Sequence, residues 1–205
     1  MKKTITILAF LISLTAFGQR EYDQYSIEAG YGLGISGAPG LADLSHYDIA
    51  FRYMLDQSWG LKFDYGHDTF NADEAPAEGS DYSRFSVQIV NNLGRGLNFR
   101  RLTNDKLTLL AHGGLGYSSL KSKTLPGTDR IGNVIVGLTP QIRIVNNLAL
   151  HADASFILNF TQHMNFDGLY PVTDGAMESF TGHLFNLSVG LTYYFGKNGD
   201  KSDWR

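Results

Sequence analysis

The strongest constraint in this sequence is a strict alternation of apolar and polar residues that recurs along the chain. It is clearest in the stretch SVGLTYYF, where Val189, Leu191, Tyr193 and Phe195 alternate with small or polar residues. Only Tyr194 interrupts the rhythm. A period of two predicts a β-strand with one face in an apolar medium and the other face in a polar medium.

The same alternation returns in seven earlier segments, which together with this one predict eight strands. No helical period persists, and after residue 19 no run reaches the roughly 18 apolar residues that a spanning helix needs. The alternating segments are Tyr25–Gly34, His46–Tyr53, Trp59–Gly66, Arg84–Ile89, Thr108–Ser118, Asn133–Ile144, Leu148–Asn159 and Phe185–Phe195.

The two faces of these segments indicate that lipid is the apolar medium. The apolar faces are large and aromatic, whereas the polar faces are rich in Gly, Ser and single charges. Most of the predicted strands run about 9–11 residues, the length that a tilted strand needs to cross the hydrocarbon layer. We therefore expect an all-β fold, an eight-stranded antiparallel up-and-down transmembrane β-barrel. The alternative is a soluble barrel of the lipocalin type, which would point its aromatic rings inward around a ligand.

Connections of alternating length are also typical of transmembrane barrels, with short turns at the periplasmic end and long loops outside. The connection Asn92–Lys106 is long for a periplasmic turn and has no explanation in the sequence. The other connections follow the rule: Met54–Ser58 and Val145–Asn147 are short, and Gly34–Ser45, Asp68–Asp81, Ser119–Gly132 and Thr161–His183 are long.

The first 18 residues have the features of a secretory signal. Lys2 and Lys3 precede an apolar run, and small residues follow at Ala16 and Gly18, so the mature chain is expected to start at Gln19. Without the two lysines, 15 basic side chains stand against 20 acidic ones, which excludes a nucleic-acid partner. The absence of Cys excludes disulfides and thiolate chemistry. We expect a barrel over residues 19–196 and a short polar periplasmic tail over residues 197–205.

The segment SVGLTYYFG resembles the terminal assembly signal of bacterial outer-membrane barrels. With IEAGYGLG, LLAHGGLGYSSLKS and GNVIVGLTPQIRI it makes the chain similar to the N-terminal barrel domain of OmpA-type proteins, particularly those of Bacteroidetes-like bacteria. The resemblance implies an outer-membrane location, recognition by the barrel insertion machinery, and contact with outer-membrane lipid and lipopolysaccharide. It does not carry over the peptidoglycan-binding domain that follows many such barrels. The assembly-signal residues it implies are Ser188, Gly190, Leu191, Tyr193 and Phe195.

Charged residues fall on the polar faces, which would line the lumen. An eight-stranded barrel is only wide enough for its side chains to fill, and buried charges must be paired. We expect a plug of ion pairs, with Glu28 against Arg52 and Asp64 against Arg84 on adjacent strands; the alternative is a gated ion path. The predicted lumen charge network comprises Glu28, Asp48, Arg52, Lys62, Asp64, Arg84, Arg143 and Asp153.

Three further patterns suggest chemistry without specifying it. His46, His67, His163 and His183 would lie near the outer rim, where they could form a metal site. A barrel hydrolase would use histidines such as His67 or His151. The acidic run from Asp68 to Asp81 lacks the ligand spacing of a calcium loop. GLGISG matches a dinucleotide-binding motif, but no helix follows it. We therefore expect no cofactor, no metal and no catalytic residue.

The last long loop carries apolar side chains, which makes it the best candidate for a contact with a partner. We expect a structural, non-enzymatic barrel that contributes to outer-membrane integrity. The alternative is an accessory subunit that docks onto another outer-membrane protein or a ligand through this loop. The predicted contact residues are Met164, Phe166, Tyr170 and Phe180.

Overall fold

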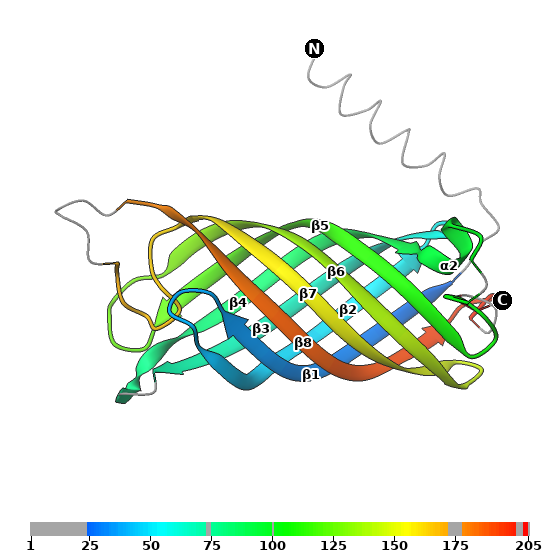
Figure 1. The fold of residues 1–205 in the computed structure, drawn as a ribbon, viewed down its shortest axis with the longest axis horizontal. Coiled ribbons are helices and arrows are strands. Elements are labelled where there is room, and N and C mark those ends of the chain that lie inside the picture. Colours follow the sequence, from blue (N-terminus) through cyan, green and yellow to red (C-terminus); the bar gives the residue numbers. More distant parts are fainter. Residues whose placement is uncertain (1–23, 73–74, 100, 172–177, 200–202, 205) are drawn as a thin grey trace, which may run out of the picture.

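The computed structural model describes residues 24–72, 75–99, 101–171, 178–199 and 203–204. The predicted signal segment, residues 1–18, and the predicted start of the mature chain at Gln19 lie outside these residues. Strands of the described part wind around one axis, tilted against it, and close into a barrel (Figure 1). Within these ranges no helix has the length and apolar character needed to cross a membrane.

All neighbouring strands are antiparallel and consecutive, and β1 closes the barrel against β8. This confirms the predicted eight-stranded up-and-down barrel. We call the end at which β1 begins and β8 ends the terminal end, and the opposite end the loop end. The strands are β1 (Tyr25–Ser36), β2 (Ala42–Met54), β3 (Trp59–Ala72), β4 (Ala75–Asn92), β5 (Leu107–Ser122), β6 (Asp129–Val145), β7 (Leu148–Gln162) and β8 (Phe180–Phe195).

The alternation seen in the sequence separates the outside of the barrel from the inside. Ile49, Phe85 and Leu115 point outward and are exposed, whereas their polar neighbours point inward and are buried. Aromatic rings gather outside at both ends of this apolar band. At the terminal end Tyr25 stacks on Tyr53, with ring centroids 5.0 Å apart. A soluble lipocalin-type barrel would have the opposite arrangement, with its rings inside.

The strands are longer than the alternation indicated. They have 12 to 18 residues because they continue at the loop end as a region in which the polarity of the two faces is reversed. There Phe70 and Tyr82 point inward and are buried. The segment Asp68–Asp81, predicted as a long loop, is therefore mostly β-ladder, with Thr69 paired to Asp81.

The long connection at the terminal end contains a single helical turn, α2 (Leu93–Gly96). Asn92 caps it, because its Oδ1 accepts a hydrogen bond from the backbone N–H of Arg95 at 3.2 Å. The same oxygen accepts the Thr103 hydroxyl at 2.8 Å, which folds the connection back on itself. This turn lies at the terminal end of the barrel (Figure 1), where Arg95 contacts Trp204.

Candidate functional site

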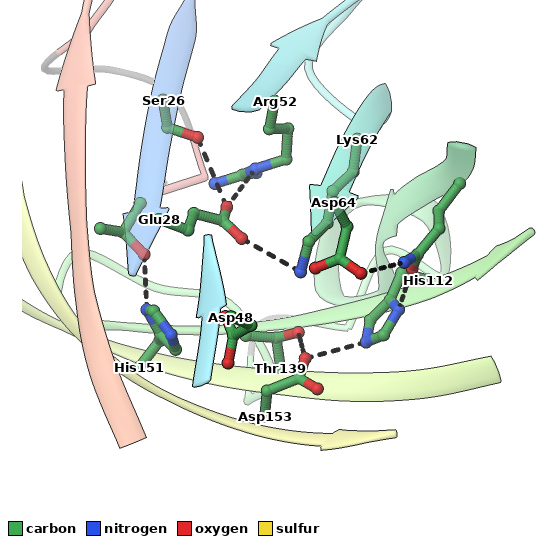
Figure 2. A network of polar contacts seen from close by, with 12 residues as sticks. Ser26, Glu28, Asp48, Arg52, Lys62, Asp64, His112, Thr139, His151 and Asp153 are labelled. Carbon is green, nitrogen blue, oxygen red and sulfur yellow. Dashed lines mark hydrogen bonds and ion pairs between the residues drawn. The ribbon is translucent and has the colours of Figure 1, made fainter. Parts of the chain in front are cut away.

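The lumen near the terminal end is occupied by ion pairs centred on Glu28. The Arg52 Nε donates to Oε1 of Glu28 at 2.8 Å, and the Nζ of Lys62 lies 3.3 Å from Oε2 (Figure 2). All three side chains are buried. Because an unpaired buried charge costs several kcal/mol, this mutual pairing is what allows them to lie away from water.

A second set of contacts crosses the middle of the lumen from β3 to β7. Asp64 accepts hydrogen bonds from Nη2 of Arg84 at 3.1 Å and from Nε2 of Gln88 at 3.4 Å. Nδ1 of His112 lies 2.6 Å from Oε1 of Gln88, and its Nε2 lies 2.9 Å from Oδ2 of Asp153. The two ring nitrogens of His112 thus contact side chains on two different strands, Gln88 on β4 and Asp153 on β7. These contacts link four strands.

A third cluster lies nearer the loop end. His46 contacts two carboxylates, with Nδ1 at 2.9 Å from Oδ1 of Asp68 and Nε2 at 3.5 Å from Oδ1 of Asp48. The Asn186 amide donates to Oδ1 of Asp68 at 3.0 Å, so β8 joins β2 and β3 here. Arg143, also predicted for the lumen charge network, lies at the terminal end. Its guanidinium donates to Asn146 and sits over the ring of Trp204, 5.9 Å from the centroid.

These contacts support the interpretation of the lumen charges as a packed network. Both strand-to-strand pairs anticipated from the sequence are present, Glu28 with Arg52 and Asp64 with Arg84. The remaining members are held by hydroxyl and amide groups as well as by charges; Oγ1 of Thr139, for example, donates to Asp153 at 2.7 Å. Such a network links strands to one another across the lumen.

An apolar cluster closes the lumen at the loop end. Met164 and Phe166, predicted to be exposed contact residues, are only 1% exposed, so that prediction is wrong. Both side chains turn into the barrel, where the ring of Phe166 packs edge-on against Phe70 with centroids 5.1 Å apart. Tyr170 is partly buried against the same cluster and Phe180 begins β8. The cluster contains Leu41, Phe70, Tyr82, Leu120, Ile131, Ile135, Ile157, Met164, Phe166 and Leu184.

Asp129 at the start of β6 holds the last loop in this position. Its Oδ2 accepts the backbone N–H of Met164 at 3.0 Å, and its Oδ1 lies 3.1 Å from Nδ1 of His163. We expect Asp129→Asn to weaken these charge-assisted hydrogen bonds by about 1–2 kcal/mol and to free the loop locally. Limited proteolysis of the folded barrel should then cut the loop at a higher rate.

Glu178→Gln is the matched control for this prediction, because it removes an exposed carboxylate from the same loop. It should leave the cleavage rate unchanged. Equal cleavage rates for the parent chain and Asp129→Asn would show that Asp129 does not anchor the loop.

The histidines considered for a metal site or a hydrolase do not converge. His46 is buried in the lumen, His163 contacts Asp129, and His183 packs near Phe156 on the outside. Among the residues that the structure describes, no group of His, Asp or Glu side chains could hold a metal ion.

The two histidines named for a hydrolase lie on opposite sides of the barrel wall. His67 is on the outer face against Ser83, whereas Nδ1 of His151 lies 2.9 Å from the hydroxyl of Thr192 inside the lumen. The structure therefore does not bring His67 and His151 together into one catalytic arrangement.

The lumen at the terminal end contains two residues from beyond β8. The sequence predicted a polar tail here, but Asp203 is fully buried and Trp204 is 3% exposed. The Asp203 carboxylate accepts two hydrogen bonds from Arg52, at 3.0 and 2.7 Å, and one from the hydroxyl of Tyr194 at 2.8 Å. These contacts also explain why Tyr194 interrupts the apolar rhythm of β8, since its side chain points into the lumen.

Known proteins that share this architecture are found among solved structures. Neither a protein-family model nor a curated protein sequence matches the chain. Solved structures do. Neisserial surface protein A is 10% identical with a TM-score of 0.55, covering 85% of this chain and 98% of that one. A major outer-membrane protein of Thermus thermophilus is 13% identical with a TM-score of 0.53, covering 84% and 99%. The attachment invasion locus protein Ail of Yersinia pestis is 16% identical with a TM-score of 0.50, also covering 84% and 99%.

The fold is that of an outer-membrane β-barrel. At these identities the likeness concerns the fold alone, so the roles of individual residues depend on their geometry in this chain. In the barrel, the residues of the predicted assembly signal divide between the two faces of β8. Ser188 and Gly190 point into the lumen, whereas Leu191 and Tyr193 are exposed on the outside, and Phe195 packs against Tyr25 with ring centroids 5.5 Å apart.

Sequence reasoning missed several lumen residues of the barrel. Asp68 was assigned to a loop, although its even position on β3 continues the inward series of Lys62 and Asp64. The alternation did contain the signal for Tyr194, which shares the parity of the other inward residues of β8. For Asp203, no local pattern in the sequence indicates that it returns to the lumen.

Proposed function

We propose that this chain is a structural, non-enzymatic outer-membrane β-barrel of the OmpA type that contributes to the integrity of the outer membrane. The observation that carries the proposal is a charged, side-chain-filled lumen enclosed by an apolar outer surface. Phe85 and Leu115 on that surface are 64% and 70% exposed, which would be unfavourable in water for a continuous belt of such residues. In lipid the same belt is the stable arrangement.

The barrel would have a defined orientation in the membrane and would reach it by export. The terminal end would face the periplasm and the loop end the outside, as the unequal connections indicate. Residues 1–18 would direct export, and the barrel insertion machinery would recognise the segment Gly190–Phe195 of β8. Lipid and lipopolysaccharide would then surround the apolar belt, and the resemblance seen in the sequence suggests a Bacteroidetes-like source.

Assembly into lipid tests this proposal. The purified chain should require detergent, should insert into phospholipid vesicles, and should migrate faster on a gel when unheated than when boiled. A chain that lacks residues 190–195 should not form the fast-migrating species. A stable, monodisperse protein in buffer without detergent would contradict the proposal, as would normal assembly of the shortened chain.

A second candidate function is docking onto another outer-membrane protein or a ligand, and one observation supports it. Met164 and Phe166 fix the last loop to the barrel, which presents Leu169, 38% exposed, at a defined position. Crosslinking in native membranes tests this role. A partner that is captured by the parent chain and lost with Leu169→Asp would support docking, whereas capture that does not depend on Leu169 would argue against it.

A further inference from the structure

Asp203 and Trp204 are contacted by groups that come from widely separated parts of the chain. Arg52 of β2 and Tyr194 of β8 bind the carboxylate, and Nδ2 of Asn92, at the end of β4, donates to the Asp203 carbonyl at 3.0 Å. We call this set of groups, together with Arg95, Arg143 and Ala149, the terminal mouth. It exists only in the closed barrel.

The charge at the terminal mouth matches an acidic side chain. Glu28 binds Nε of Arg52 but is shared with Lys62, so Nη1 and Nη2 of the guanidinium have no bond to this carboxylate; Nη1 also lies 3.5 Å from Sδ of Met54. Asp203 fills both positions in the bidentate geometry that suits Arg and a carboxylate best. Since Arg52 is fully buried, an empty mouth would leave two of its donors without a carboxylate partner.

The shape of the mouth matches an aromatic side chain at the next position. The Trp204 ring packs edge-on against Tyr194, with centroids 6.3 Å apart, and lies beneath the guanidinium of Arg143. Ala149 completes this buried cluster with its small side chain. The Trp204 carbonyl also accepts a hydrogen bond from Nη2 of Arg95 in α2. The long connection after β4, unexplained by the sequence, thus forms one wall of the mouth.

We propose that the terminal mouth is a recognition site for an Asp–Trp peptide segment, which residues 203 and 204 occupy in cis. Occupancy latches the segment after β8 to β2, β4 and β6, so the latch closes only when the first and last strands have paired. A binding site of this kind selects peptide segments by two features at once. It binds an acidic residue that is followed by a large aromatic residue.

The first test follows the environment of Trp204 by fluorescence. The chain has two tryptophans, so Trp59→Phe leaves Trp204 as the single reporter. In the folded barrel its emission should be blue-shifted and poorly quenched by aqueous acrylamide. Adding Asp203→Asn should release the segment and raise the quenching constant several-fold. The control Asp105→Asn removes an exposed carboxylate from the connection after β4 and should change nothing.

Two results would overturn the proposal. One is free quenching of Trp204 in the folded Trp59→Phe barrel, and the other is equal quenching of that barrel with and without Asp203→Asn. Hydroxyl-radical footprinting of the unsubstituted chain provides a measurement that does not depend on Trp59→Phe folding. Trp204 should be protected from oxidation in the folded barrel and oxidised after unfolding. Equal oxidation in the two states would also overturn the proposal.

The second test asks whether the mouth binds the peptide in trans. A fluorescent peptide of residues 196–205 should bind the Asp203→Asn barrel saturably, and should bind the parent barrel several-fold more weakly because the mouth is already filled. The same peptide with Asp203→Asn should bind neither barrel. Equal binding of both peptides to both barrels would indicate adsorption to detergent and would contradict recognition at the mouth.

Discussion

Replacing Gly190 with valine is expected to abolish assembly of the barrel. Gly190 pairs with Gly30 where β8 closes against β1, and the two backbones approach closely. A Cβ atom at position 190 would lie 2.0 Å from the carbonyl oxygen of Ala29, which is backbone and cannot move aside without separating the strands. The measurement is the fraction of chain that migrates as the fast, unheated species after folding into vesicles, and we expect this species to be lost.

Gly132→Val is the matched control. Gly132 also lies within a barrel strand, but apart from its two chain neighbours no residue places an atom within 4 Å of a Cβ built at this position. This variant should fold like the parent, because valine suits an exposed strand position with open space around it. Normal assembly of Gly190→Val, or equal loss with both variants, would show that close packing at the β1–β8 seam is not what requires glycine.

The second large effect is expected from Arg52→Leu. The substitution removes the cation that pairs with both Glu28 and Asp203, and leaves two buried carboxylates with fewer partners. Breaking a buried ion pair in this way typically lowers the free energy of unfolding by about 3–5 kcal/mol. Urea titration of the barrel in vesicles, followed by gel migration, would measure the loss.

A double-mutant cycle separates the pair from its surroundings. Asp203→Asn in the Arg52→Leu background should lower the free energy of unfolding much less than it does in the parent, because its main partner is already absent. Arg130→Leu removes an exposed arginine at the loop end and should change stability by less than about 0.5 kcal/mol. Strict additivity of the two substitutions would contradict the contact between Arg52 and Asp203.

The sequence predicted the part of this fold with an apolar outer surface well, because one physical rule governs it. Where lipid lies outside and paired charges lie inside, residues alternate with a period of two, and both strand number and strand order follow. The same parity placed Glu28, Asp64 and their partners on the inner face. It could not give the three-dimensional pairing of more distant groups, such as Gln88 between Asp64 and His112, since that depends on how the closed barrel brings β3, β4 and β5 together.

The prediction failed at the two ends for different reasons. At the loop end the polarity of the faces is reversed, so residues such as Phe70 ended the expected pattern while the strand continued. Met164 and Phe166 looked like exposed loop residues because a sequence does not show that an open barrel end needs apolar side chains to fill it. At the terminal end, burial of Asp203 depends on Arg52, which lies 151 positions away in the chain.

In a membrane-spanning barrel, the reversal of polarity at the loop end would suit each long strand to lipid along one part and to water along the next. β4 has 18 residues, whereas about 9–11 are enough to cross the hydrocarbon layer. If the barrel spans the membrane as proposed, the remainder, with its apolar cluster inside, would extend beyond the lipid into water. Any contact made by the loops would then take place at the far end of this extension of the barrel, at a distance from the lipid head groups.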